Sequence, residues 1–205
     1  MSTRTLAVVS AGLSTPSSTR LLADRLTAAT VEALRGRGDD ATVEVVELRE
    51  HARGLADTLV TGFPPAALRD AIATVTGADG LVAVTPVFSA SYSGLFKTFF
   101  DVLEPGALTG TPVLLGATAG SARHSLVLEH AMRPLFAYLR AIVVPTAVFA
   151  ASEDWADGDG GALAPRVDRA AGELADLVTG RPSRARPADP FADFVPFDQL
   201  LGDQA

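Results

Sequence analysis

A run of hydroxyl side chains follows the first apolar segment of the 205-residue chain. Six of the eleven residues at positions 10–20 are serine or threonine, and leucines at helical spacing begin directly afterwards. At a helix N-terminus, unpaired N–H groups and the positive end of the helix dipole attract anions such as phosphate. We therefore expect a phosphate site here, although Ser17 or Ser18 is also expected to cap the helix.

Two further loops have compositions that suit a ligand. The segment Thr85–Gly94 combines aromatic rings, small residues and hydroxyls, which can lie against a flat heterocycle. A proline turn followed by a helix cap would explain this segment equally well. The segment Thr118–Ala122 contains Gly120, where the backbone can approach a ligand closely.

Short apolar runs alternate with longer stretches of helical period, which is typical of a parallel sheet with crossover helices. The five predicted strands are Leu6–Ser10, Thr42–Leu48, Gly80–Thr85, Pro112–Ala117 and Ile142–Phe149. The five predicted helices cover residues 18–35, 64–76, 93–104, 123–140 and 165–179. Glutamates interrupt the second apolar run, so we expect it at the sheet edge. The predicted fold class is α/β, a flavodoxin-like, doubly wound five-stranded parallel sheet in the order 2-1-3-4-5, with a C-terminal tail.

The predicted topology brings the three loops together. In an open parallel sheet, ligands bind beyond the carboxyl ends of the strands where the strand order reverses, here between the first and third strands. The hydroxyl-rich loop, the aromatic loop and the glycine loop all follow strands near that point. A phosphate site, a wall for a flat ring and exposed amides together fit flavin mononucleotide (FMN).

The composition argues against several classes of function. A net charge of −7 would repel nucleic acid, and the absence of cysteine excludes thiolate metal sites and a cysteine nucleophile. None of the three histidines forms a His-x-x-x-His pair, so no metal site is expected. No signal peptide or run long enough to span a membrane is recognisable, which predicts a cytoplasmic protein without membrane contact.

The chain divides into two predicted parts. Residues 1–180 are expected to form the flavodoxin-like FMN-binding domain. Residues 181–205 are predicted to be a Pro- and Arg-rich linker and an apolar tail, in which phenylalanines recur at roughly helical spacing. That tail could pack on its own domain, contact a neighbouring subunit or cover the site.

The segment Ala78–Asp101 resembles the flavin loop and following helix of the NADPH-dependent FMN reductases, and is most similar to the branch that supplies reduced flavin to alkanesulfonate and luciferase-like monooxygenases. The likeness extends from Thr5 to about Ala151. It implies that the phosphate is held by Ser10, Ser14, Ser17, Ser18, Thr19 and Arg20. It further implies that Pro86, Val87, Phe88 and Ser89 line the ring and that Thr118, Ala119 and Gly120 face its pyrimidine edge. Arg20 could equally lie on the helix surface.

The resemblance also implies the reaction and its partners. FMN would accept hydride from NADPH or NADH, a reaction that needs no catalytic side chain for acid–base chemistry. The recipient of reduced FMN would be a luciferase-like flavin-dependent monooxygenase. Broad apolar arcs on the helices at 93–104 and 123–140 predict a homodimer or homotetramer. Pro134 predicts an irregular turn in the second of these helices, where the segment Glu129–Pro134 resembles the π-bulge of that branch.

Two alternatives remain open from the sequence. One is a quinone, azo or metal-ion reductase on the same fold. The other is a flavodoxin-type electron carrier that keeps its FMN and does not react with a nicotinamide. Flavodoxins commonly place aromatic residues on the ring from the loop after the second strand, whereas His51–Gly62 contains none. The reductase is therefore favoured over the carrier.

Overall fold

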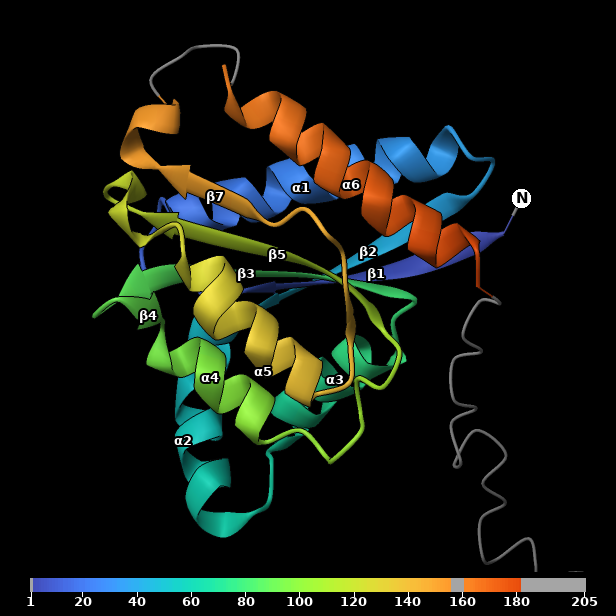
Figure 1. Ribbon diagram of the computed structural model, residues 1–205. Coiled ribbons are helices and arrows are strands. Elements are labelled where there is room, and N and C mark those ends of the chain that lie inside the picture. The colour runs from blue at the N-terminus through green and yellow to red at the C-terminus, as the bar shows by residue number, and fades with distance from the viewer. Residues whose placement is uncertain (1, 156–160, 182–205) are drawn as a thin grey trace, which may run out of the picture.

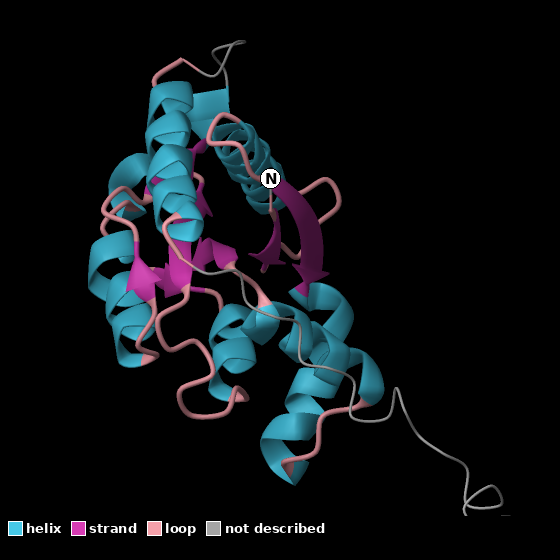
Figure 2. Ribbon diagram, turned by 90° about the vertical axis from the view of Figure 1, so that its right-hand side faces the viewer, coloured by secondary structure: helices cyan, strands magenta, loops and turns pink. Residues whose placement is uncertain are grey.

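A computed structural model describes residues 2–155 and 161–181. Its centre is a sheet with helices against both faces (Figure 1), and Figure 2 shows the strands, in magenta, with helices on either side. The strands are β1 (Thr3–Ser10), β2 (Asp40–Glu47), β3 (Gly80–Phe88), β4 (Ser91–Tyr92), β5 (Pro112–Ala119), β6 (Ile142–Val143) and β7 (Val148–Ala151). The α-helices are α1 (Ser18–Arg35), α2 (Ala52–Thr61), α3 (Ala66–Gly77), α4 (Gly94–Asp101), α5 (Arg133–Tyr138) and α6 (Leu163–Thr179).

The predicted fold class is confirmed. The parallel strands follow the order β2-β1-β3-β5-β6, which corresponds to the predicted order 2-1-3-4-5 with β2 at the edge. The central strands β1, β3 and β5 are almost entirely buried, because helices cover both of their faces. Because these strands are parallel, their carboxyl ends lie on the same side of the sheet, and the predicted loops begin there.

Alternating side chains of the strands serve two separate cores. In β1, Leu6 and Val8 pack with residues of α1 and α6 on one face of the sheet. Ala7 and Val9 pack on the other face, with residues of α2, α3, α4 and α5. The two-residue period of a strand gives each face its own apolar set.

The prediction for the last strand was wrong in its continuity. Instead of one strand over residues 142–149, β6 and β7 pair separately with successive parts of β5. Pro145 lies between them and lacks the N–H that a continuous ladder needs. The prediction also missed α2, which fills part of the segment between β2 and α3, and the short antiparallel strand β4.

The irregular turn predicted near Pro134 is confirmed. The segment predicted as one helix over 123–140 is divided into a short 3₁₀ turn, a π-helical turn over Leu128–Met132 and α5. Pro134 is the second residue of α5, where its missing N–H costs little. Arg133 pairs with Glu129 across the junction at 2.6 Å, which lowers the pKa of the Glu129 carboxyl.

Four phenylalanines form an aromatic cluster under α4 and α5. The ring centroids of Phe96 and Phe100 are 4.8 Å apart, as are those of Phe100 and Phe136, and Phe99 packs edge-on against Phe100. Much of the apolar arc of α4 is therefore covered within the chain itself. The predicted homodimer or homotetramer stays a prediction.

Two further predictions concern the ends and surroundings of the chain. Helix α6 ends at Thr179, next to the predicted domain boundary, while the predicted linker and tail at 181–205 lie outside the described residues except for Arg181. Within residues 2–155 and 161–181, no helix has the length and apolar character needed to cross a membrane.

Candidate functional site

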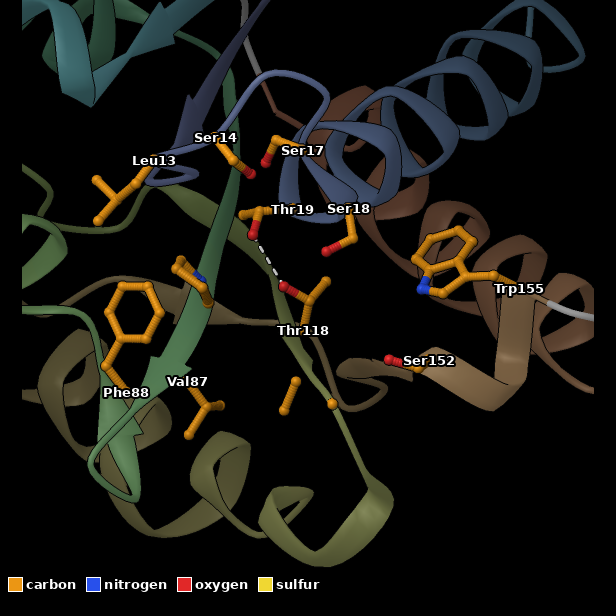
Figure 3. Close-up of a pocket in the computed structure, with 13 residues that line it drawn as sticks. Leu13, Ser14, Ser17, Ser18, Thr19, Val87, Phe88, Thr118, Ser152 and Trp155 are labelled. Carbon is orange, nitrogen blue, oxygen red and sulfur yellow. Dashed lines mark hydrogen bonds between the residues drawn. The ribbon is translucent and has the colours of Figure 1, made fainter.

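A cavity of about 490 Å³ lies beyond the carboxyl ends of β1, β3, β5 and β7 (Figure 3). Pockets that bind small ligands and cofactors are typically of this size. Its walls come from four segments of chain: Leu13, Ser14, Ser17, Ser18, Thr19, Pro86, Val87, Phe88, Thr118, Ala119, Gly120, Ser152 and Trp155.

The structure brings together ten of the thirteen site residues predicted from the sequence. These are Ser14, Ser17, Ser18, Thr19, Pro86, Val87, Phe88, Thr118, Ala119 and Gly120. Ser10, Arg20 and Ser89 do not line the cavity. Ser10 is fully buried at the end of β1, with an Oγ that has no partner in the described chain, and Ser89 lies in the exposed turn between β3 and β4 with a φ of 47°.

Most hydroxyls of the first loop hydrogen-bond within the protein. Ser17 is the N-cap of α1, and its Oγ accepts from the Arg20 amide at 3.3 Å. Ser14 donates to the Pro16 carbonyl, while Thr19 shares a 2.8 Å hydrogen bond with Thr118. Within the described chain, Ser18 is the cavity-lining hydroxyl of this loop that has no such partner. Its side chain and the first amides of α1 can therefore meet an anion.

Arg20 points away from the cavity toward the edge strand. Its guanidinium bonds Glu47 at 2.6 Å and Asp24 at 2.7 Å, and these carboxylates raise the pKa of Arg20. The resemblance implied that Arg20 binds the phosphate, but in this structure its guanidinium is already paired with two carboxylates.

Arg49 holds the first loop from outside the cavity, through a contact that was not predicted from the sequence. It follows β2 and donates to Thr15 Oγ1 and, at 3.3 Å, to the Ser14 carbonyl. The contact joins segments more than thirty residues apart, and no local pattern in the sequence indicates it.

The opposite end of the cavity is made by β3 and β5. Pro86, Val87 and Phe88 end β3, and Thr85 fixes the return of the chain because its Oγ1 accepts from the Ser93 amide at 3.0 Å. Gly120 follows β5 directly, and a Cβ added to it would have no atom within 4 Å. The backbone at Gly120 is therefore open to a ligand.

Three lining residues, Leu13, Ser152 and Trp155, were not predicted from the sequence. Ser152 and Trp155 belong to the 3₁₀ turn that directly follows β7. Because β7 pairs in parallel with β5, its carboxyl end lies at the same edge of the sheet. The sequence predicted one strand ending at Phe149, so the turn at 152–155 was not expected to reach the site.

Comparisons with known proteins show which chains this one is similar to. The family model described as NADPH-dependent FMN reductase matches residues 4–156. A protein of Pseudomonas putida named NADH-dependent FMN reductase SfnE is 41% identical over 165 residues, 80% of this chain and 86% of that protein. An oxidoreductase structure from Corynebacterium diphtheriae has a TM-score of 0.85 and 51% identity, covering 88% of this chain and 99% of that one. The apo structure of an NADH:FMN oxidoreductase has a TM-score of 0.72 and 26% identity, covering 91% and 96%.

Proposed function

The chain belongs to the NADPH-dependent FMN reductase family, and on that premise we propose that the cavity beyond β1, β3 and β5 is its FMN site. As a member of the family the chain is an NAD(P)H:FMN oxidoreductase, with FMN and NADPH or NADH as its cofactors. The observation that carries the assignment of the site is the meeting of an α1 N-terminus, an apolar wall and the open backbone at Gly120 in one cavity.

The residues present fit FMN from end to end. At one end, the Ser18 hydroxyl and the first amides of α1 offer donors to a phosphate. At the other, Pro86 and Val87 offer an apolar wall against which a ring can lie. The exposed backbone at Gly120 offers polar groups to the edge of that ring.

The protein contributes positioning in this proposal. Bound FMN supplies the hydride-accepting ring, and the hydride donor is the reduced nicotinamide of NAD(P)H. The residues of β3 and β5 that line the cavity would hold the ring and orient it for the nicotinamide. Amides at Ala119 and Gly120 would favour negative charge on the ring edge after reduction.

We further propose that the reduced FMN passes to a separate flavin-dependent monooxygenase of the luciferase-like class, in the cytoplasm. The segment 78–101 supports this, because it resembles the reductases that supply reduced flavin to alkanesulfonate and luciferase-like monooxygenases. The rim of the cavity also supports it, because Leu13 is 55% exposed and Phe88 46% exposed, so no part of the described chain closes the entrance over them. A site that stays open suits a flavin that enters and leaves.

The activity can be measured by nicotinamide oxidation. Purified protein is expected to oxidise NADPH or NADH rapidly only when free FMN is added, because the flavin is the hydride acceptor. The decrease in nicotinamide absorbance, recorded with and without FMN, is the measurement. A bound yellow flavin without nicotinamide oxidation would indicate the electron carrier instead, and faster turnover with a quinone or azo dye would indicate the alternative reductase.

We propose that the enzyme is a homodimer or homotetramer. Leu126 is 63% exposed and Tyr138 is 85% exposed, on either side of the π-helical turn. Aromatic side chains such as Tyr138 are enriched in protein interfaces relative to the rest of the surface. Light scattering at micromolar concentration is expected to give at least twice the chain mass of 21.2 kDa. A single-chain mass would contradict the proposal.

A further inference from the structure

Trp155 is the single tryptophan of the chain and forms one wall of the cavity. Figure 3 shows its indole on the side of Ser18, with the ring nitrogen on the edge that faces the cavity. Within the described chain, no acceptor is hydrogen-bonded to the indole Nε1. An indole N–H has donor capacity only, and it usually finds a partner when partly buried.

The turn that carries Trp155 is held firmly in place. Asp154 accepts from the Ala151 amide at 2.8 Å and pairs with Arg166 of α6, also at 2.8 Å. Arg166 in turn donates to the Phe149 carbonyl at 3.2 Å. These contacts tie the turn to both β7 and α6, so the position of the indole is determined by the fold.

One face of the indole is already covered. The guanidinium carbon of Arg25 lies 5.0 Å from the ring centroid, within the range of a cation–π contact. In residues 2–155 and 161–181, Arg25 forms no ion pair with a carboxylate. Among the described residues, Trp155 thus has an N–H without an acceptor beside an arginine without a carboxylate partner, and both features favour an anionic acceptor.

We infer that Trp155 is a phosphate-binding residue of the FMN site, which donates its indole N–H to the phosphate beside the Ser18 hydroxyl. This inference rests on the proposed function. The FMN phosphate carries about −1.5 to −2 charges near neutral pH. Arg20 cannot balance this charge while it pairs with Glu47 and Asp24, whereas Arg25 lies over the indole itself.

Riboflavin lacks the phosphate, so the affinities for FMN and for riboflavin should respond differently to the loss of the Trp155 N–H. Trp155→Phe removes the N–H and keeps an aromatic ring against Arg25. We expect the Kd for FMN to rise roughly tenfold, as for the loss of one hydrogen bond to a charged group, and the Kd for riboflavin to stay the same. Titrations followed by quenching of flavin fluorescence give both constants. Phe63→Leu is the control, since it replaces an exposed aromatic side chain outside the cavity and should change neither constant.

A second variant keeps the indole. Arg25→Gln is expected to weaken FMN binding a few-fold, to leave riboflavin unchanged and to reduce the salt dependence of FMN binding, because one positive charge is lost. In the unmodified protein, FMN should quench the emission of Trp155, the chain's single tryptophan.

The outcomes are distinguishable. If Trp155→Phe keeps the FMN-to-riboflavin ratio of the unmodified protein, whether by binding both normally or by losing both equally, the phosphate role is overturned while the FMN site stands. If the unmodified protein binds neither flavin, the proposed function itself fails. If Trp155→Phe unfolds at a lower temperature than the control, the Arg25→Gln ratio decides.

Discussion

Replacing Gly120 by valine is expected to reduce FMN-dependent NAD(P)H oxidation by about 100-fold or more, comparable to the loss of a donor to a developing negative charge. The chain should still fold normally, because a Cβ at this position has no atom of the protein within 4 Å. The added isopropyl group would instead occupy the space where the backbone meets the ring edge. Steady-state oxidation rates and thermal unfolding of the same preparation are the measurements.

A graded series makes this prediction sharper. Gly120→Ala adds one methyl group and should lose less activity than the valine variant. Gly77→Ala is the control, since its Cβ also has open space but lies at the end of α3, outside the cavity. Normal FMN affinity and turnover in Gly120→Val would refute the placement of the ring edge.

Replacing Gly12 by alanine is expected to weaken FMN binding by roughly 100-fold, the equivalent of two hydrogen bonds to a charged group. A Cβ at Gly12 would lie 2.1 Å from the Ser17 Oγ, so the Ser17 side chain must move. Ser17 is the N-cap of α1, and the loss of such a cap costs about 1 kcal/mol of stability. The amides at the start of α1 would then no longer present a common anion site.

Two measurements separate the local effect from a general one. Urea unfolding should show the small loss of stability, and flavin titration should show the much larger loss of affinity. Ser17→Ala tests the cap alone and should match Gly12→Ala in stability but lose less FMN affinity, because the loop keeps its path. Equal affinities of Gly12→Ala and the unmodified protein would contradict the phosphate site at α1.

The central strands and their loops could be predicted because the chemistry is local. Val8 and Val9 both lie in a continuously apolar run of the kind that is typical of a strand buried on two faces. The hydroxyls before α1 and the glycine after β5 are adjacent in sequence to the elements that place them. For this reason the three predicted loops meet in one cavity, which is lined by ten of the residues that the family resemblance implied.

The remaining features depend on contacts between distant segments. Arg20 pairs with Glu47, twenty-seven positions away, so its direction could not be read from the helix that carries it. Helix α2 was missed because it buries only Leu55 and Thr58, too few residues for an apolar stripe. No local pattern predicts a role for Trp155, because its neighbours in the sequence are acidic and glycine-rich, and it is the short strand β7 before it that brings it to the site.

The buried hydrogen bond between Thr19 and Thr118 joins the start of α1 to the end of β5 at 2.8 Å. This hydrogen bond links two walls of the cavity directly. Their separation is therefore set by the fold and does not depend on a bound ligand. A preorganised span of this kind avoids the entropy loss of ordering loops upon association. The same hydrogen bond would make the site select ligands by their length, since a shorter or longer molecule could not contact both walls at once.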